Sequence, residues 1–394
     1  MTGNTLGWVI VAFVLYLLMM IAIGAFYAKG NNNSEDYFLG GRKLNGFVAA
    51  LSAQASDMSG WLLMGLPGAI YLTGVGGDGW IAIGLFIGTT LNWLFIATKL
   101  RRYTIRANNS VTLPTYFENR FHDDKKVLMT VSSITIVVFF LVYCASALSA
   151  GGQLFESVFG IDYHVALTIG ALVVLVYTFL GGFTAVCVTD FIQGMLMLVG
   201  ILAVPLFAYH FLTGNGATLA AGLEASGADS ANFLNLMKNG DGSNNIVSVI
   251  SGLGWGLGYF GMPHILVRFM AVRDEKEMTK SKATAISWVA LSLGFAVFIG
   301  ILGRAYLPEL VNGNNEKVFI EMIKKVFTVE MRAPFVAGLF LCGILAAIMS
   351  TADSQLLVSA SSVAEDIFKG LLKKDADDKT VMNVSRVTVL VVAV

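Results

Sequence analysis

Charged residues are scarce in this chain of 394 residues, in which Asp, Glu, Lys and Arg together make up 13% of the sequence. A soluble protein of this size carries about a quarter charged residues, so the composition excludes an ordinary cytosolic enzyme. Basic and acidic residues are equal in number, and the net charge is zero. This balance argues against nucleic acid as a partner.

Cysteine is also rare: Cys144, Cys187 and Cys342 all fall in apolar runs, and no CxxC pair occurs. Such cysteines are typical of small buried side chains rather than of disulfides or metal sites. The four histidines are scattered, and Walker A, HExxH and GxSxG patterns are absent. A GxGxxG pattern at 256–261 lacks the strand that precedes it in dinucleotide folds. We therefore expect no enzyme activity and no organic cofactor.

Long apolar runs are what the sequence has instead, with a mean hydropathy of +0.72. Residues 7–28 hold no charge over 22 positions, which is enough to cross about 30 Å of hydrocarbon. Without a cleavage site, this segment is expected to be a retained span. Further apolar segments lie at 45–73, 79–98, 127–155, 164–181, 185–212, 246–267, 283–303 and 334–364, and a tenth starts near 381. The sequence predicts an all-α multi-pass membrane protein surrounded by lipid, cut off in mid-helix at Val394.

The distribution of Lys and Arg predicts the orientation of these segments. The connections 29–43, 99–126, 268–282 and 369–386 hold 20 of the 26 basic residues and alternate with connections that hold few. The positive-inside rule therefore predicts an N-terminus outside a plasma (inner) membrane. The connection 304–333 departs from the rule because it holds five basic residues. Its periodic apolar residues predict a short surface helix.

Two of the segments contain residues that interrupt helices. Segment two carries Gly60, Gly65, Pro67 and Gly68, and segment seven has five glycines between 252 and 261, followed by Pro263. Each glycine costs a helix about 1 kcal/mol and each proline about 3 kcal/mol. Close packing with a proline kink is one explanation. The other is a pair of broken helices in an inverted repeat of five plus five helices. This repeat would divide the single domain 1–394 into an extra helix and loop (1–44), a first repeat (45–212) and an incomplete second repeat (246–394).

Three acidic residues, Asp57, Asp190 and Asp353, fall inside apolar segments. An aspartate in the middle of a membrane span costs about 2.5–3.5 kcal/mol, so it normally faces a partner or a cavity. The alternative for each is a structural ion pair or a helix cap, and Asp190 near a segment start suits a cap. Asp57 lies in the interrupted stretch, where a cation-related role is favoured.

Segment nine carries Ala347, Ser350, Thr351 and Ser354 at a spacing that places them on one helix face. Such a stripe commonly serves helix packing. If it faces the interruption in segment two, its hydroxyls and the carbonyls near Ala55 and Met58 form an all-oxygen cage without a carboxylate. Sodium suits such ligands better than zinc or copper, which prefer nitrogen and sulfur.

Aromatic residues accompany both interruptions. Trp61 follows the first, and Trp255, Tyr259 and Pro263 recur every four residues along the second, roughly on one face. Trp and Tyr in membrane helices are often interface anchors, but these lie at the interruptions rather than at span ends. We expect them to line a cavity.

Five stretches carry a resemblance to a known family: 50–69, 143–160, 181–194, 254–271 and 346–358. They resemble the sodium/solute symporter family, and within it the bacterial sodium/proline symporters, from about residue 8 to the end. The resemblance implies a leucine-transporter-type inverted-repeat fold with one extra N-terminal helix. It implies sodium ligation by the carbonyls of Ala55, Met58 and Ala347 and by the side chains of Ser350 and Thr351.

The same resemblance implies a function, sodium-coupled import of L-proline by alternating access. Proline contacts map to Trp61, Tyr143, Trp255, Tyr259 and Pro263, and backbone donors around Ser59 and Gly60 would take its carboxylate. Asp57 would attract cations and gate the site. Some relatives have a second cation site that maps to Asp190, Ser350 and Ser354, where Asp353 replaces an expected serine; we expect one essential sodium and no obligatory protein partner. The alternatives are another small solute (an amino acid, a sugar, sialic acid or pantothenate) and the membrane domain of a sensor kinase.

Overall fold

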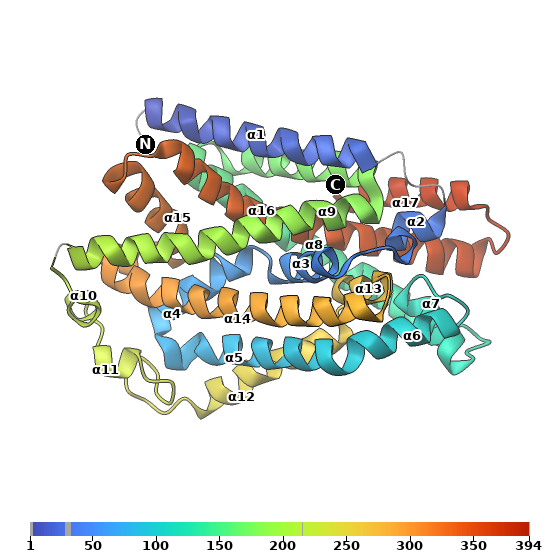
Figure 1. The fold of residues 1–394 in the computed structure, drawn as a ribbon, viewed down its shortest axis with the longest axis horizontal. Coiled ribbons are helices and arrows are strands. Elements are labelled where there is room, and N and C mark those ends of the chain that lie inside the picture. The colour runs from blue at the N-terminus through green and yellow to red at the C-terminus, as the bar shows by residue number, and fades with distance from the viewer. Residues whose placement is uncertain (1–2, 28–32, 215, 394) are drawn as a thin grey trace.

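The computed structural model describes residues 3–27, 33–214 and 216–393, and in this part of the chain the only β-structure is two isolated bridges. The all-α prediction is confirmed. Figure 1 shows the long helices lying side by side along one direction. They are α1 (Gly3–Tyr27), α5 (Val75–Leu91), α8 (Val127–Phe159), α9 (Tyr163–Gly214), α14 (Glu275–Tyr306) and α16 (Pro334–Ser361).

Shorter helices complete the bundle and its two ends. They are α2 (Ser34–Leu39), α3 (Gly46–Met58), α4 (Gly65–Thr73), α6 (Thr98–Arg106), α7 (Leu113–Phe121), α10 (Leu219–Ala225), α11 (Ser230–Phe233), α12 (Ile246–Gly254), α13 (Pro263–Ala271), α15 (Val318–Ile323) and α17 (Asp378–Ala393). A 3-10 turn, η3 (Gly60–Leu62), separates α3 from α4, and another, η5 (Trp255–Gly261), separates α12 from α13.

Six helices of the described residues are long and apolar enough to cross a membrane, and the bent pair around η5 would make a seventh span. The predicted segment 45–73 is divided into α3, η3 and α4, none of which reaches span length alone. The predicted segments 164–181 and 185–212 are joined in α9, which departs from helical geometry at Gly182 with φ 62°. The tenth predicted segment corresponds to α17.

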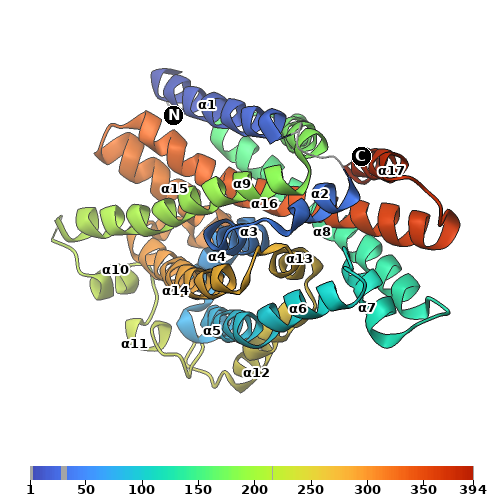
Figure 2. The ribbon, with the colours of Figure 1, turned by 45° about the vertical axis from the view of Figure 1, so that its right-hand side comes forward.

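The centre of the molecule is α3, which packs against α9, α13, α14 and α16. Figure 2 shows α3 enclosed by these helices, with α1 and α5 farther out. Helix α16 is buried along most of its length, its polar residues included. In contrast, Leu18 on α1 and Phe139 on α8 are more than half exposed, which fits contact with lipid.

Glycines bring α5 and α12 into close contact, and the two helices lie side by side in both views (Figures 1 and 2). A Cβ on Gly84 would lie 2.2 Å from the Gly252 carbonyl oxygen, and one on Gly88 would lie 2.2 Å from the Gly256 carbonyl oxygen. The packing interpretation is therefore confirmed for Gly252 and Gly256. It does not explain the glycines at 254, 258 and 261, where an added Cβ would meet no atom within 4 Å.

The connection 304–333 differs from its prediction. Its helix α15 is not a surface helix: Val318, Phe319 and Ile320 are buried, and it packs against α4, α9, α14 and α16. A π-helical stretch, Lys324–Glu330, continues it. Together with α10 and α11 it lies at one end of the bundle, whereas α2, α6, α7 and the start of α17 lie at the other end, where the Lys- and Arg-rich connections gather (Figure 1).

Candidate sodium and substrate site

The interruption of segment two is a sharp end of α3 at Met58. Ser59 adopts φ 53° and ψ −174°, outside the helical region, and its hydroxyl accepts a hydrogen bond from the Trp61 backbone N–H at 3.1 Å. The last four carbonyls of a helix have no intrahelical partner. The carbonyls of residues 55–58 are therefore left without partners from their own helix, in the middle of the bundle.

The hydroxyl stripe of α16 faces this helix end. The Ser350 Oγ lies 2.8 Å from the carbonyl oxygen of Ala55 and 3.2 Å from that of Ala347. The Thr351 Oγ1 lies 3.0 Å from the same Ala347 oxygen. These four residues are fully buried, so the structure brings four of the five predicted sodium ligands together at the contact between α3 and α16. The fifth, Met58, is the last residue of α3 and is 2% exposed.

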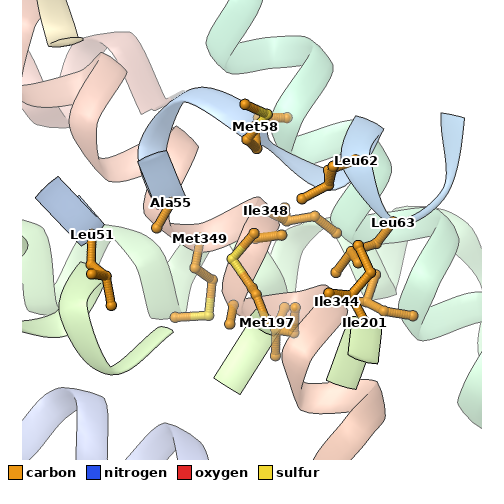
Figure 3. Close-up of a cluster of buried hydrophobic side chains, with 14 of the residues drawn as sticks. Leu51, Ala55, Met58, Leu62, Leu63, Met197, Ile201, Ile344, Ile348 and Met349 are labelled. Atoms are coloured by element: carbon orange, nitrogen blue, oxygen red, sulfur yellow. The ribbon is translucent and has the colours of Figure 1, made fainter. Parts of the chain in front are cut away.

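Apolar packing fixes this contact in place. Figure 3 shows Ala55 and Met58 of α3 beside Ile348 and Met349 of α16, with Met197 of α9 below them. The cluster excludes water, which strengthens electrostatic interactions in its interior. Its polar atoms are neutral oxygens, the ligand type that hard cations prefer. Among the described residues there is no group of three or more His, Cys, Asp or Glu side chains with metal-site geometry.

A cavity of about 230 Å³ opens on the other side of the α3 end. Seven of the predicted residues line it: Asp57, Met58, Ser59, Trp61, Tyr143, Trp255 and Tyr259. Leu85 of α5, Gly258 and Met262 complete the lining. This small cavity is below the usual 300–1,000 Å³ of drug-sized ligand sites. It therefore suits a small solute with an apolar part.

A second, larger cavity of about 570 Å³ adjoins the small one and shares Ser59, Trp61, Tyr143, Trp255 and Met262 with it. The indole rings of Trp61 and Trp255 stack between the two interrupted helices, with centroids 5.8 Å apart and planes inclined by 20°. Gly60 lines only the larger cavity. The aromatic prediction thus holds for Trp61, Tyr143, Trp255 and Tyr259 as cavity-lining residues.

Pro263 is placed differently from the other predicted substrate contacts. It is the first residue of α13 and is buried, and it lines a separate narrow space together with Val267 and Arg268 rather than either cavity above. Its effect is on the backbone, because a proline removes the hydrogen bond that the Tyr259 carbonyl would receive. The amide Nδ2 of Asn92 on the facing helix donates to that carbonyl at 2.8 Å instead.

Asp57 borders the small cavity and is 8% exposed. Tyr259 is its hydrogen-bonding neighbour, but the Asp57 Oδ2 has no hydrogen-bond partner. No ion pair in the described part of the chain includes Asp57. The side chain therefore presents an uncompensated carboxylate to the cavity.

Asp190 has a different environment, and the cap interpretation is wrong for it. It lies inside α9, fully buried, with its Oδ2 3.0 Å from Nη2 of Arg268. The Ser52 hydroxyl donates to the same Oδ2 at 2.6 Å and accepts from Arg268 Nε at 3.0 Å. Arg268, only 1% exposed, also donates to the His264 carbonyl oxygen at 2.6 Å. The ion-pair alternative is confirmed for Asp190.

The remaining predicted cation ligands adjoin this pair. Arg268 Nη2 donates to the Ser354 Oγ at 2.5 Å, and the Ser354 hydroxyl donates to Asp353 Oδ1 at 3.1 Å. The guanidinium thus stands among Asp190, Ser52 and Ser354. It occupies the place between α9 and α16 to which the second cation site of some relatives maps.

The sequence does not identify Arg268 as a site residue, because the basic connection 268–282 is predicted to begin at it, whereas α13 continues to Ala271. It also missed Ser146, Ser149 and Gln153 on α8, which line the larger cavity. A signal for these three existed. Together with Tyr143 they form a polar stripe at helical spacing on an otherwise apolar helix.

This geometry, with two interrupted helices around a central cavity in a helical bundle, defines a secondary transporter of the leucine-transporter fold class. Solved structures support the class. A substrate-bound, outward-open Na+-coupled sialic acid symporter superposes with a TM-score of 0.82 at 22% identity, covering 98% of this chain and 80% of that one. Mhp1, a nucleobase-cation-symport-1 family transporter in a closed conformation, superposes with a TM-score of 0.56 at 14% identity, covering 91% of this chain and 74% of that one.

Sequence comparison identifies the family. The chain matches the Sodium:solute symporter family over residues 37–394 and belongs to it. It is 44% identical over 390 residues to the sodium/proline symporter of Escherichia coli K12, which covers 98% of this chain and 75% of that protein. It is also 44% identical over 377 residues to the high-affinity proline transporter PutP of Bacillus subtilis 168, with coverages of 95% and 77%. The protein is a sodium-coupled solute symporter of the membrane and not an enzyme.

Proposed function

We propose that this protein couples the inward movement of sodium to uptake of L-proline across the cell membrane, with its N-terminus outside. The observation that carries the proposal is the end of α3 at Met58. The Ala55 carbonyl of its last turn accepts a hydrogen bond from the Ser350 hydroxyl of α16, while side chains of the same turn border the small aromatic cavity. One helix end thus serves both ligands. The similarity to proline transporters supports proline as the solute.

In this proposal, sodium binds the carbonyls of Ala55, Met58 and Ala347 and the hydroxyls of Ser350 and Thr351. The Ser350 hydroxyl then turns its lone pairs to the ion instead of its proton to Ala55. The ion joins α3 to α16 and orders the turn at Ser59, so the adjacent cavity becomes competent for the solute.

The solute is placed by both interrupted helices. Its ring packs on the aromatic faces of Trp61 and Trp255, while backbone N–H groups around Gly60 take its carboxylate. Alternating access follows from rocking of the repeats 45–212 and 246–394 about this fixed site. One positive charge crossing 100 mV supplies about 2.3 kcal/mol, which alone sustains about fifty-fold accumulation.

We propose one coupling sodium rather than two. The Asp190 carboxylate already has a positive partner, the Arg268 guanidinium, which also contacts Ser354. A second sodium would have to displace this side chain from a fully buried position. A transport stoichiometry of two sodium ions per solute would contradict this part of the proposal.

The test measures binding of labelled proline to the purified chain in sodium and after replacement of sodium by choline. We expect binding that collapses in choline. A panel of unlabelled amino acids, sugars, sialic acid and pantothenate then competes with proline. Absence of proline binding in both media refutes the proposed solute, and binding that persists in choline refutes the proposed sodium site.

A further inference from the structure

Asp57 is the charged group of the site that the protein itself leaves uncompensated. Of the described residues that line the small cavity, none is Lys, Arg or His. The Oδ2 atom is buried and has no hydrogen-bond partner. Asp190, by comparison, is fully buried but has an arginine and a serine as partners.

A buried carboxylate without a cationic partner is costly, because one hydrogen bond from Tyr259 does not replace the hydration that its charge loses. The missing partner must therefore be a cation that enters the cavity. The proposed sodium position does not supply it, because that ion is surrounded by neutral oxygens on the side of α3 that faces α16. The cation that reaches Asp57 must come with the solute.

We propose that the Asp57 carboxylate binds the ammonium group of the transported solute, and that this contact selects amine-bearing solutes over uncharged isosteres. This inference rests on the proposed function and deepens it, since proline is a zwitterion whose secondary ammonium has two N–H donors. One N–H donates to Asp57 Oδ2. The substrate carboxylate points away from Asp57, towards the backbone of η3.

The arrangement makes a specificity prediction. A site built around a buried hydrogen-bonding group rejects ligands that lack the matching group by far more than an apolar pocket does. Tetrahydrofuran-2-carboxylate has the ring and carboxylate of proline with oxygen in place of the NH2+ group. We expect it to bind at least about 100-fold more weakly than proline, because it offers no proton and no charge to Asp57.

The experiment combines this ligand change with Asp57→Asn in a double-mutant cycle on the full chain in sodium. Ligand-induced stabilisation against thermal unfolding reports both affinities, including weak ones, because it follows the ratio of ligand concentration to dissociation constant. Asp78→Asn, at the start of α5 and outside both cavities, is the matched control for loss of one negative charge. We expect the discrimination to fall below about 10-fold in Asp57→Asn and to stay unchanged in Asp78→Asn.

A different result is expected if Asp57 binds sodium instead of the solute. Asp57→Asn then raises the sodium concentration needed for half-maximal binding and weakens the binding of both ligands equally. The discrimination between the two ligands then persists, and the inference is overturned. If the Asn variant is not recovered as folded protein, Asp57→Glu takes its place. It keeps the charge, so discrimination retained above about 10-fold supports the inference and its loss contradicts it.

Failure of the inference can be distinguished from failure of the proposed function. If the wild type does not bind proline but binds another amine-bearing solute of the panel, only the proposed solute is wrong. The double-mutant cycle is then repeated with that solute and its analogue without the amine. If the wild type binds only a sugar or another solute without an amine, both are wrong.

Discussion

The buried pair of Asp190 and Arg268 offers the most quantitative prediction. Removing one partner of a buried ion pair costs about 3–5 kcal/mol, because the other charge is left without compensation. Arg268→Met keeps most of the side-chain volume and removes the charge. With an unfolding entropy of about 2.1 cal/mol/K per residue, this loss lowers the midpoint of thermal unfolding of this chain by about 4–6 °C.

The double variant Asp190→Asn/Arg268→Met separates the ion pair from packing. It leaves no unpaired charge, so its destabilisation should be smaller than the sum of the two single variants, by a coupling of about 1–3 kcal/mol. The measurement is thermal unfolding of purified variants in choline. Additive effects would refute the view that the two charges compensate each other.

A sodium titration extends the same experiment to stoichiometry. In Arg268→Met the oxygens of Asp190, Ser52 and Ser354 lose their cation but keep their places, and a carboxylate with hydroxyls suits a hard cation. We expect sodium to restore part of the stability of this variant, by about 2.7 kcal/mol at 100 times its dissociation constant. A sodium response equal to that of the wild type would refute the proposal that the guanidinium takes the place of a second ion.

Three further predictions concern the surrounding structure. Ser350→Ala and Thr351→Ala remove one proposed ligand each and should raise the sodium concentration for half-maximal proline uptake about tenfold or more, whereas Thr351→Ser should stay near wild type; unchanged sodium dependence would contradict the ligand assignment. Gly84→Ala places a Cβ 2.2 Å from the Gly252 carbonyl oxygen, so it should lower thermal stability by about 1–3 kcal/mol. Arg42→Ala removes a guanidinium hydrogen bond that ties the chain before α3 to the α13 carbonyl of Met270 at 2.9 Å, and amide hydrogen exchange at Leu44, whose N–H donates to the Ala271 carbonyl, should become faster.

The sequence was informative where a residue type has a large local cost. Glycine and proline raise the free energy of a helix, and tertiary packing must offset this cost. Pro67 and Pro263 therefore indicated both interrupted segments. The hydroxyl stripe of α16 was visible for a similar reason, because Ser350 and Thr351 repeat at helical spacing. Long apolar runs also located most of the spans, because few charged residues interrupt them.

The sequence was uninformative where a partner lies far along the chain. Nothing near Arg268 shows that Asp190 is 78 positions away and 3.0 Å distant, and the positive-inside rule assigned this arginine to a loop. Asn92 has no local signal either, although it donates to the carbonyl that Pro263 frees. The burial of α15 depends on four helices packing over it, and a segment with several charges gives no indication of that cover.

In the proposed mechanism, the last turn of α3 couples sodium and solute without direct contact between them. Its carbonyls face α16 because the helix ends there, and its side chains Asp57 and Met58 border the cavity because the same turn continues the helical rotation. An ion that fixes the carbonyls therefore also fixes Asp57 and the turn at Ser59. Coupling between two ligands is reciprocal and typically amounts to about 1–3 kcal/mol, or 5- to 150-fold in affinity. A shared helix end can supply this range, because a turn that the first ligand has ordered costs the second ligand less entropy to order.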